Sequence, residues 1–290
     1  MELIVSLRQM QQYADARRCA GHRIAVVPTM GYFHQGHLSL IRRARELADV
    51  VITTLFVNPT QFGPGEDYER YPRDLDRDRH LAEEAGSDVL FAPTVEEMYP
   101  GGYTTTVTVH GVSEKFEGAF RPGHFQGVAT IVTKLFLATK PHVAVFGQKD
   151  WQQTLVVRQL VRDLNFDVDI VVAPTVREPD GLAMSSRNVY LSPQERQQAT
   201  VLYRALQHAR SLLEGGERRR QALVAALEHV LRSVPELQID YAAAADALTL
   251  DEPDQFLPGQ TVVLLVAARL GSTRLIDNEL VQVPRRREEA

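Results

Sequence analysis

The stretch IAVVPTMGYFHQGH at residues 24–37 decides the fold of this chain. Residues 24–27 are continuously apolar, which is the pattern of a parallel strand buried on both faces. A proline and a glycine interrupt the pattern, so residues 29–35 are expected to form a loop. Residues 36–48 then carry apolar side chains at helical spacing, namely Leu40, Ile41, Ala44, Leu47 and Ala48. A strand, a loop and a helix in this order indicate an α/β fold.

Two histidines, His34 and His37, follow the strand, and His37 falls in the first turn of the predicted helix. Backbone N–H groups and the positive end of the helix dipole lie there, so the junction favours an anion, most often a phosphate. Two imidazoles would add further donors. A structural alternative is that His34 caps the turn while His37 packs on the helix. Zinc is another alternative, but no third ligand stands nearby, and the only cysteine is the distant Cys19.

Segments with strand character recur along the first part of the chain. We predict strands at residues 49–57, 88–92, 104–109, 142–146 and 168–172. Helical patterns are expected at residues 6–19, 75–86 and 125–140, with another helix that ends near Asn165. Ser6 and Gln9 have the spacing of a capping box, and the charges of residues 75–86 read mostly as a solvated face. The alternation predicts a Rossmann-like doubly wound parallel sheet.

A smaller α+β domain is expected after a boundary near Arg177, so the predicted domains are residues 1–176 and 177–290. Its predicted elements are helices at residues 193–214 and 217–234, strands at residues 239–243 and 261–268, and a turn with a final strand at residues 271–278. The charged tail at residues 284–290 is expected to be disordered.

Two further loops place polar side chains directly after predicted strands. Asn58 and Gln61 follow the second strand, where polar groups face the ligand crevice of an open α/β sheet. GQKD at residues 147–150 repeats the geometry of the first site. Lys149 offers a point charge to phosphate, and Asp150 could cap the helix, hold a ribose hydroxyl or orient Mg²⁺-bound water. Plain turn chemistry, or an ordinary cap beside a surface lysine, is the structural alternative at these positions.

Two segments rich in turn-forming residues read as covers of a site. SEKFEGAFRPGHFQ at residues 113–126 looks mobile, and its Arg121 and His124 could reach an anionic substrate. A solvated loop explains either residue equally well. APTVREPDGLAMSSRNVYL at residues 173–191 indicates a shaped loop with hydroxyl and guanidinium donors.

Composition limits the class of protein. The 290 residues are 44% hydrophobic and 24% charged, which is ordinary for a globular chain. A net charge of −5 gives no broad basic field, so we expect neither nucleic-acid nor membrane binding. With one cysteine, no leader pattern and no apolar run near the length of a membrane span, a cytoplasmic protein is expected.

PTMGYFHQGH at residues 28–37 resembles the nucleotide-binding loop of the pantothenate synthetases, or pantoate:β-alanine ligases, in the superfamily of nucleotidyltransferases with an HxGH motif. GQKD, RPGHF and MSSR extend the resemblance along nearly the whole chain, and MSSR resembles the lysine-serine loop that clamps triphosphate. The sequence departs from the family pattern at Phe33, where leucine is usual, at Thr60, where methionine is usual, and at Trp151, where a smaller aromatic is common.

This resemblance implies an ATP-dependent ligase that condenses (R)-pantoate with β-alanine through a pantoyl adenylate and releases AMP and pyrophosphate. It also implies ATP as substrate, Mg²⁺ as cofactor and a homodimer, without assigning a protein group that holds the metal. A nucleotidyltransferase that leaves the nucleotide on its product, a zinc-dependent hydrolase and a non-catalytic nucleotide sensor are the alternatives.

Matching motif by motif, the resemblance implies a role for each site residue. The expected catalytic residues are His34, His37 and Lys149. ATP contacts are expected from Met30, Gly31, His34, Gly36, His37, Gly147, Gln148, Lys149, Asp150, Val176, Met184, Ser185, Ser186 and Arg187. Gln61 would contact both pantoate and β-alanine, and Gln153 would also hold pantoate. Asn58 would contact β-alanine, and Arg121 would border the pantoate site.

Overall fold

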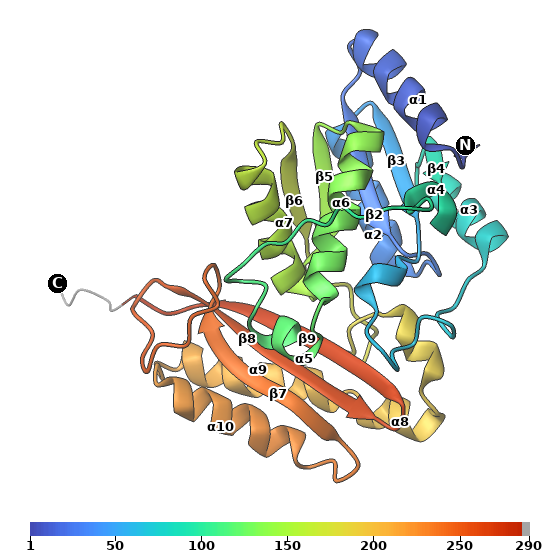
Figure 1. The fold of residues 1–290 in the computed structure, drawn as a ribbon. Coiled ribbons are helices and arrows are strands. Elements are labelled where there is room, and N and C mark those ends of the chain that lie inside the picture. Colours follow the sequence, from blue (N-terminus) through green and yellow to red (C-terminus); the bar gives the residue numbers. More distant parts are fainter. Residues whose placement is uncertain (286–290) are drawn as a thin grey trace. The chain divides into compact units, whose positions relative to one another are not determined.

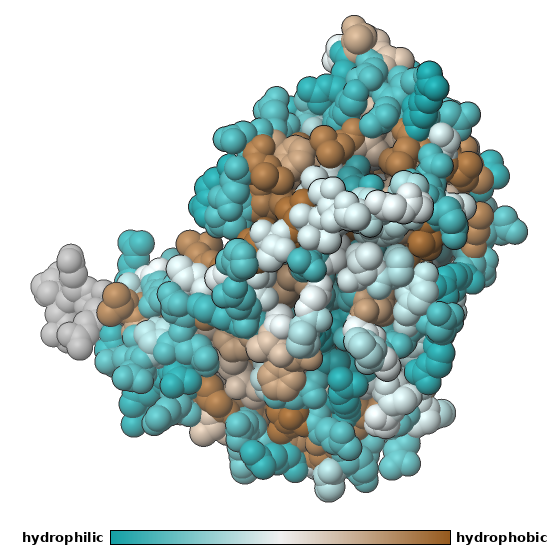
Figure 2. All heavy atoms as spheres, viewed as in Figure 1, coloured by the Kyte–Doolittle hydropathy of each residue, from teal (hydrophilic) through white to brown (hydrophobic). Residues whose placement is uncertain are grey.

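The computed structural model describes residues 1–285 and divides into two compact units, Met1–Val176 and Arg177–Ala290 (Figure 1). Each unit encloses its own hydrophobic core. Charged and polar residues lie along much of the outer margin of the face seen in Figure 2, with hydrophobic residues in smaller groups between them. No helix in the described part of the chain is long and apolar enough to cross a membrane.

The first unit is built on a six-stranded sheet whose strands pair in parallel, in the order β1-β4-β3-β2-β5-β6. The strands are β1 (Glu2–Ile4), β2 (Ile24–Thr29), β3 (Val50–Leu55), β4 (Val89–Phe91), β5 (Val143–Gly147) and β6 (Asp169–Ala173). The strand order reverses at β2, which pairs with β3 on one side and β5 on the other. The predicted Rossmann-like doubly wound sheet is confirmed, and its switch point lies beyond the carboxyl ends of β2 and β5.

Helices cover both faces of this sheet, which is why β2 is apolar on both sides. The helices of this unit are α1 (Leu7–Cys19), α2 (Gln35–Leu47), α3 (Leu75–Glu84), α4 (Val95–Met98), α5 (Phe116–Phe120), α6 (His124–Thr139) and α7 (Trp151–Asp163), with 3-10 turns η1 (Pro59–Gln61) and η2 (Gln148–Asp150). Ile24 and Val26 pack with α1, α6 and α7. Ala25 and Val27 pack with α2 and α3 on the opposite face.

The second unit packs helices on one face of an antiparallel sheet of three strands in the order β7-β8-β9. Its elements are η3 (Ser186–Tyr190), α8 (Pro193–Gln198), α9 (Val201–Glu214), α10 (Arg220–Leu231), β7 (Gln238–Asp246), β8 (Thr261–Leu270) and β9 (Thr273–Gln282). Leucines of α9 and α10 bury against alternate residues of β8. This arrangement confirms the smaller α+β domain.

Several predicted elements differ from those observed. Residues 104–109 form no strand: they are extended but lie in no ladder, and Val107 is held instead by Thr130 of α6. In Figure 1 the chain passes across α6 here before it turns toward α5. The helix predicted at residues 193–214 is broken into α8 and α9. The cover at residues 113–126 contains α5 and the start of α6, and its predicted mobility stays a prediction.

Local capping and burial also differ from expectation. Ser6 makes no side-chain cap, and the N–H of Leu7, the first residue of α1, donates to Glu97 at 2.6 Å. Asp78 of α3 is buried rather than solvated. The short strand β1 was not predicted at all. Residues 286–290 of the tail predicted to be disordered lie outside the described residues.

Candidate active site

The junction between β2 and α2 carries the two histidines in fixed orientations. His34 is the N-cap of α2, and its Nδ1 accepts the Gly36 N–H at 3.1 Å. His37 Nδ1 accepts the His34 N–H at 3.4 Å, and the centroids of the two rings lie 4.1 Å apart. The backbone thus orients both imidazoles.

These hydrogen bonds assign the protons on the two rings. A neutral imidazole that accepts at Nδ1 carries its hydrogen on Nε2, so each ring keeps one N–H donor. Burial, followed by the nearby charges of Lys149 and Arg77, lowers the pKa of His34 from 6.5 to about 4. Burial, together with His34 and Lys149, lowers the pKa of His37 well below its ordinary value. Near neutral pH both rings are therefore uncharged donors, and the capping role expected as an alternative uses only the Nδ1 atom of His34.

The backbone amides of this junction are less available than the sequence suggested. The N–H groups of Tyr32 and Phe33 both donate to Asp78, at 2.5 and 2.7 Å. Those of His34 and Gly36 donate to the imidazoles. The expectation of free amides in the first helical turn is therefore wrong for Gly36, and the loop amides of Tyr32 and Phe33 are engaged as well.

Asp78 and Arg77 of α3 complete the junction, and neither was singled out from the sequence. The Asp78 side chain is only 1% exposed, and burial raises the pKa of its carboxyl group, while the Phe33 and Tyr32 N–H groups act in the opposite direction. Arg77 donates to the Phe33 carbonyl at 2.8 Å. Only the 46-residue separation along the chain hid the contact between Asp78 and Tyr32.

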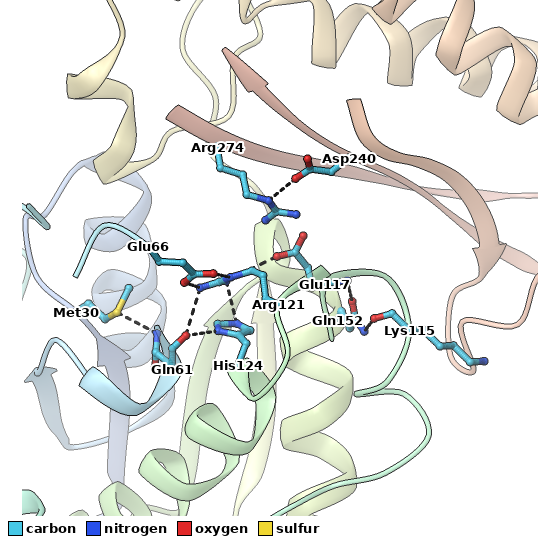
Figure 3. A network of polar contacts seen from close by, with 10 residues as sticks. All are labelled: Met30, Gln61, Glu66, Lys115, Glu117, Arg121, His124, Gln152, Asp240 and Arg274. Atoms are coloured by element: carbon cyan, nitrogen blue, oxygen red, sulfur yellow. Dashed lines mark hydrogen bonds and ion pairs between the residues drawn. The ribbon is translucent and has the colours of Figure 1, made fainter. Parts of the chain in front are cut away.

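Gln61 and Asn58 lie together in the turn after β3. The Gln61 Nε2 atom donates to the Met30 sulfur at 3.0 Å, so it reaches the loop after β2 (Figure 3). Asn58 is 1% exposed, and its Nδ2 atom donates to the Gln61 Oε1 atom at 3.2 Å and to the Gly127 carbonyl at 3.1 Å. With both N–H bonds of its amide engaged, Asn58 orients Gln61 in this structure.

Arg121 and His124 form a compact network with two carboxylates (Figure 3). Arg121 makes two hydrogen bonds to Glu66, at 2.8 and 2.7 Å, and lies 3.7 Å from Glu117. His124 donates from Nδ1 to the Gln61 carbonyl at 2.8 Å, because its Nε2 faces an Arg121 N–H at 3.2 Å. Burial and Arg121 lower the pKa of His124 to about 4. The sequence analysis did not identify these two glutamates. Their negative charges neutralise Arg121, which weakens the attraction of its guanidinium for an anionic substrate.

The loop after β5 carries Lys149, whose charge acts on the two histidines. Gly147 ends β5, and Gln148, Lys149 and Asp150 form η2 at the head of α7. The charge of Lys149 contributes to lowering the pKa values of both His34 and His37. Asp150 makes no capping hydrogen bond, so the capping alternative is wrong for its side chain.

Two adjacent glutamines of α7 have different surroundings. Gln152 is buried, accepts the Glu117 N–H at 3.0 Å, and donates to the carbonyl groups of Val112 and Lys115 at 2.7 Å each. Gln153 is half-buried, and its amide has no hydrogen-bond partner among the described residues. Gln152 therefore fixes the segment before α5, and the role of Gln153 as a pantoate contact stays a prediction.

The MSSR loop belongs to the second unit, while Val176 ends the first. Ser185 caps η3 by accepting the Arg187 N–H at 3.2 Å, Ser186 is buried, and Met184 is half-buried. The base of the loop is fixed by Arg177, which makes a two-point ion pair with Asp277 of β9 at 2.6 and 3.0 Å.

Comparisons with known proteins match almost the entire chain. The family model described as pantoate-beta-alanine ligase matches residues 2–280. The chain belongs to this ligase family.

Pantothenate synthetases of similar length support the assignment. The relative from Salinibacter ruber is 53% identical over 98% of this chain and 99% of its own length. The relative from Moorella thermoacetica is 53% identical over the same shares of the two chains.

Solved structures of ligase family members share the fold. Pantothenate synthetase from Thermus thermophilus is 50% identical, covers 96% of this chain and 99% of its own, and has a TM-score of 0.90. Pantoate-beta-alanine ligase from Francisella tularensis, complexed with beta-gamma ATP and beta-alanine, is 33% identical, covers 97% of each chain and has a TM-score of 0.79.

The departures from the ligase family pattern fit their surroundings. Phe33 is fully buried in the core between the sheet and α2. The Thr60 hydroxyl donates to Asn58 at 3.0 Å and lies 3.2 Å from the Tyr99 hydroxyl, so it joins the network around Gln61. Trp151 is largely buried at the start of α7. No group of three or more His, Cys, Asp or Glu residues within residues 1–285 is arranged to hold a metal.

Proposed function

We propose that this ligase joins (R)-pantoate to β-alanine in two steps through a pantoyl adenylate, releasing AMP and pyrophosphate. The observation that carries the proposal is the pair of neutral donors, His34 and His37, beside Lys149 at the switch point of the sheet. A carboxylate does not accept an amine directly because its oxygen is a poor leaving group. Transfer of AMP to that oxygen supplies a good one.

In the first step a pantoate carboxylate oxygen attacks the α-phosphorus of ATP. The new oxygen–phosphorus bond forms as the bond to the bridging oxygen breaks, and pyrophosphate leaves with the electron pair. The Nε2–H groups of His34 and His37 and the ammonium of Lys149 would stabilise the charge that grows on the phosphate oxygens. No proton transfer from the histidines is required.

The remaining predicted ATP contacts would complete the nucleotide site. Ser185, Ser186 and Arg187 would add hydroxyl and guanidinium donors to the triphosphate, and Val176 would lie against adenine. Mg²⁺ would enter with ATP and neutralise part of the phosphate charge. A cation held mainly by substrate phosphates needs few protein carboxylates. The Asp150 carboxylate makes no capping hydrogen bond, so it would be suited to orient a water bound to Mg²⁺.

In the second step the neutral amine of β-alanine attacks the acyl carbonyl. The carbon–nitrogen bond forms, the bond to the phosphate oxygen breaks, and AMP leaves with the electron pair while the amine loses a proton. Gln61 and Gln153 would hold pantoate so that each attack is effectively intramolecular. Asn58 remains a proposed contact of β-alanine, and Arg121 a proposed border of the pantoate site.

We also propose a division of labour between the domains. Residues 1–176 would bind ATP and pantoate, and residues 177–290 would act as a lid that excludes water from the adenylate. Hydrolysis would otherwise consume the activated acid. The enzyme would work in the cytoplasm, where ATP is supplied.

A homodimer is proposed as the working assembly. Residues 104–109 support it, because they are extended and rich in β-branched side chains, and apart from Val107 their backbone N–H groups have no partner among the described residues. Antiparallel pairing with the same segment of a second copy would satisfy the N–H groups of alternate residues, such as Thr106, which point away from the side on which Val107 donates to Thr130. Thr106→Pro removes one of them and should shift the mass measured by light scattering toward the monomer; an unchanged dimer would reject this interface.

Chromatography of nucleotides after incubation with ATP, Mg²⁺ and pantoate, with and without β-alanine, tests the proposal. We expect AMP, pyrophosphate and pantothenate in turnover amounts only when both organic substrates are present. Intact ATP under every condition would contradict the ligase. Pyrophosphate release with the nucleotide retained on the product would instead identify a nucleotidyltransferase.

A further inference from the structure

Two neighbouring residues of α3 grip the loop that precedes the first histidine. The Asp78 carboxylate accepts the N–H groups of Tyr32 at 2.5 Å and Phe33 at 2.7 Å, one on each oxygen. Arg77 donates to the Phe33 carbonyl at 2.8 Å, and its guanidinium lies over the Tyr32 ring at 5.0 Å. The whole peptide segment before His34 is therefore held from α3.

The backbone of this loop needs such a hold. Gly31 has φ +89° and Tyr32 has φ +52°, so two consecutive residues are in the left-handed region, which a tyrosine rarely adopts. A Cβ atom on Gly31 would lie 3.0 Å from an Asp78 oxygen and 3.1 Å from Leu55. The loop therefore packs closely against α3 and β3. Its Tyr32 and Phe33 N–H groups point toward α3 and both donate to the Asp78 carboxylate.

Placing a carboxylate here is costly for the fold. Asp78 is 1% exposed, whereas Asp76, in the same helical turn, is exposed. Burial of a charge is unfavourable unless its hydrogen bonds are well formed. The Arg77 guanidinium is 3.5 Å away and offsets part of that cost. A buried charge devoted to two loop amides indicates that the position of this loop matters.

We propose that Asp78 is a positioning residue for the adenylation step: by fixing residues 31–33 it sets where the Nε2–H groups of His34 and His37 meet the phosphate. This inference rests on the proposed function. The link is direct, because His34 follows Phe33 in the chain. The His34 ring accepts a hydrogen bond from the Gly36 N–H, and the His34 backbone N–H donates one to the His37 ring. A shift of Phe33 passes to both imidazoles.

Asp78→Asn tests this role, with Asp76→Asn as the matched control on the same turn. The amide keeps the shape of the side chain but replaces one acceptor oxygen by a donor that faces a backbone N–H. We expect the rate of pantoate-dependent pyrophosphate release in a single turnover to fall roughly 10- to 100-fold, the scale of a misplaced catalytic group. The KM for β-alanine should stay unchanged, and Asp76→Asn should match the wild type.

The His34→Ala background separates positioning from general loss of structure. Because His34→Ala keeps the His34 backbone N–H that orients His37, Asp78→Asn should still lower the rate in that background through His37, but by a smaller factor than in the wild type. An equal fold-change in both backgrounds, or a wild-type rate for Asp78→Asn, would overturn the inference. A wild type that releases no pyrophosphate with pantoate would instead overturn the proposed function itself.

Arg77→Met keeps the inference testable if Asp78→Asn does not fold. It removes the hydrogen bond to the Phe33 carbonyl, the contact with the Tyr32 ring and the ion pair with Asp78, from a side chain that is 43% exposed. A rate loss that is smaller in the His34→Ala background than in the wild type supports the inference, and an unchanged rate overturns it.

Discussion

His37 accepts the backbone N–H of His34 through Nδ1, and the centroids of the two rings lie 4.1 Å apart. Since His34 Nδ1 accepts the Gly36 N–H in turn, the same contacts that cap α2 leave both Nε2–H groups for a ligand. The two lowered pKa values make these groups neutral donors rather than cations. In each ring, Nδ1 accepts a backbone N–H of the loop or helix, while Nε2–H is the group proposed to contact the phosphate.

Substitution of His34 separates these two roles. His34→Ala removes cap and donor, so it should lower the adenylation rate by roughly 10² to 10³ and the free energy of unfolding by about 1 kcal/mol. His34→Asn keeps a side chain that caps helices well and should restore most of the stability but little of the rate. Rapid-quench pyrophosphate release and urea unfolding measure the two effects; a wild-type rate in His34→Asn would contradict the donor role.

Gln61→Ala should act on one substrate more than on the other. Loss of one hydrogen-bonding amide should raise the KM for pantoate roughly tenfold, with a smaller effect on the KM for ATP. Met30→Leu is the matched control, because it removes only the sulfur that accepts from Gln61 and should change the KM for pantoate less. Steady-state kinetics with each substrate varied decide the matter, and equal effects of Gln61→Ala on both KM values would argue against a pantoate contact.

Stability should depend on pH through His124. Burial and Arg121 lower its pKa from 6.5 to about 4. Between these values the unfolded chain binds a proton at this position and the folded protein does not, so stability should be lost as the pH falls from about 6.5 toward about 4. His124→Asn keeps a donor for the Gln61 carbonyl but cannot titrate, and should weaken this dependence in melting curves at several pH values. His80 is exposed, and His80→Asn should leave the dependence of stability on pH unchanged. The same change of melting temperature with pH in both variants would reject the assignment to His124.

The ion pair between Arg177 and Asp277 should be a major support of the second unit. Both side chains are largely buried, at 16% and 2% exposure, so Arg177→Met leaves a buried charge and should cost about 3–5 kcal/mol. Arg196→Met, at the more exposed pair with Asp180, should cost about 1 kcal/mol or less. Urea unfolding compares them, and similar losses would show that burial of the pair has little influence.

Local sequence patterns were sufficient where an element is defined by its own periodicity. The apolar run at residues 24–27 and the helical spacing after it predicted β2 and α2, because burial on both faces of a sheet leaves a continuous signal. Residues 104–109 show the limit of this reasoning. Their threonines and valines favour an extended backbone, but a strand also needs a partner, which the described chain does not supply.

Long-range polar contacts were the part of the site that sequence could not predict. Asp78 and Glu66 look like solvated carboxylates in a charged helix and a polar loop. Their partners, the Tyr32 N–H and Arg121, lie 46 and 55 residues away along the chain. In the same way the Ser6 cap is replaced by Glu97, 90 residues from Leu7. Only the fold brings such groups together.

The most direct test of the account is to follow oxygen from the acid to the nucleotide. Pantoate labelled with ¹⁸O in its carboxylate is incubated with ATP, Mg²⁺, β-alanine and the enzyme, and the AMP is analysed by mass spectrometry. Attack of the carboxylate on the α-phosphorus predicts one ¹⁸O atom in each AMP formed. AMP without the label would contradict the acyl adenylate and with it the roles proposed for His34, His37 and Lys149.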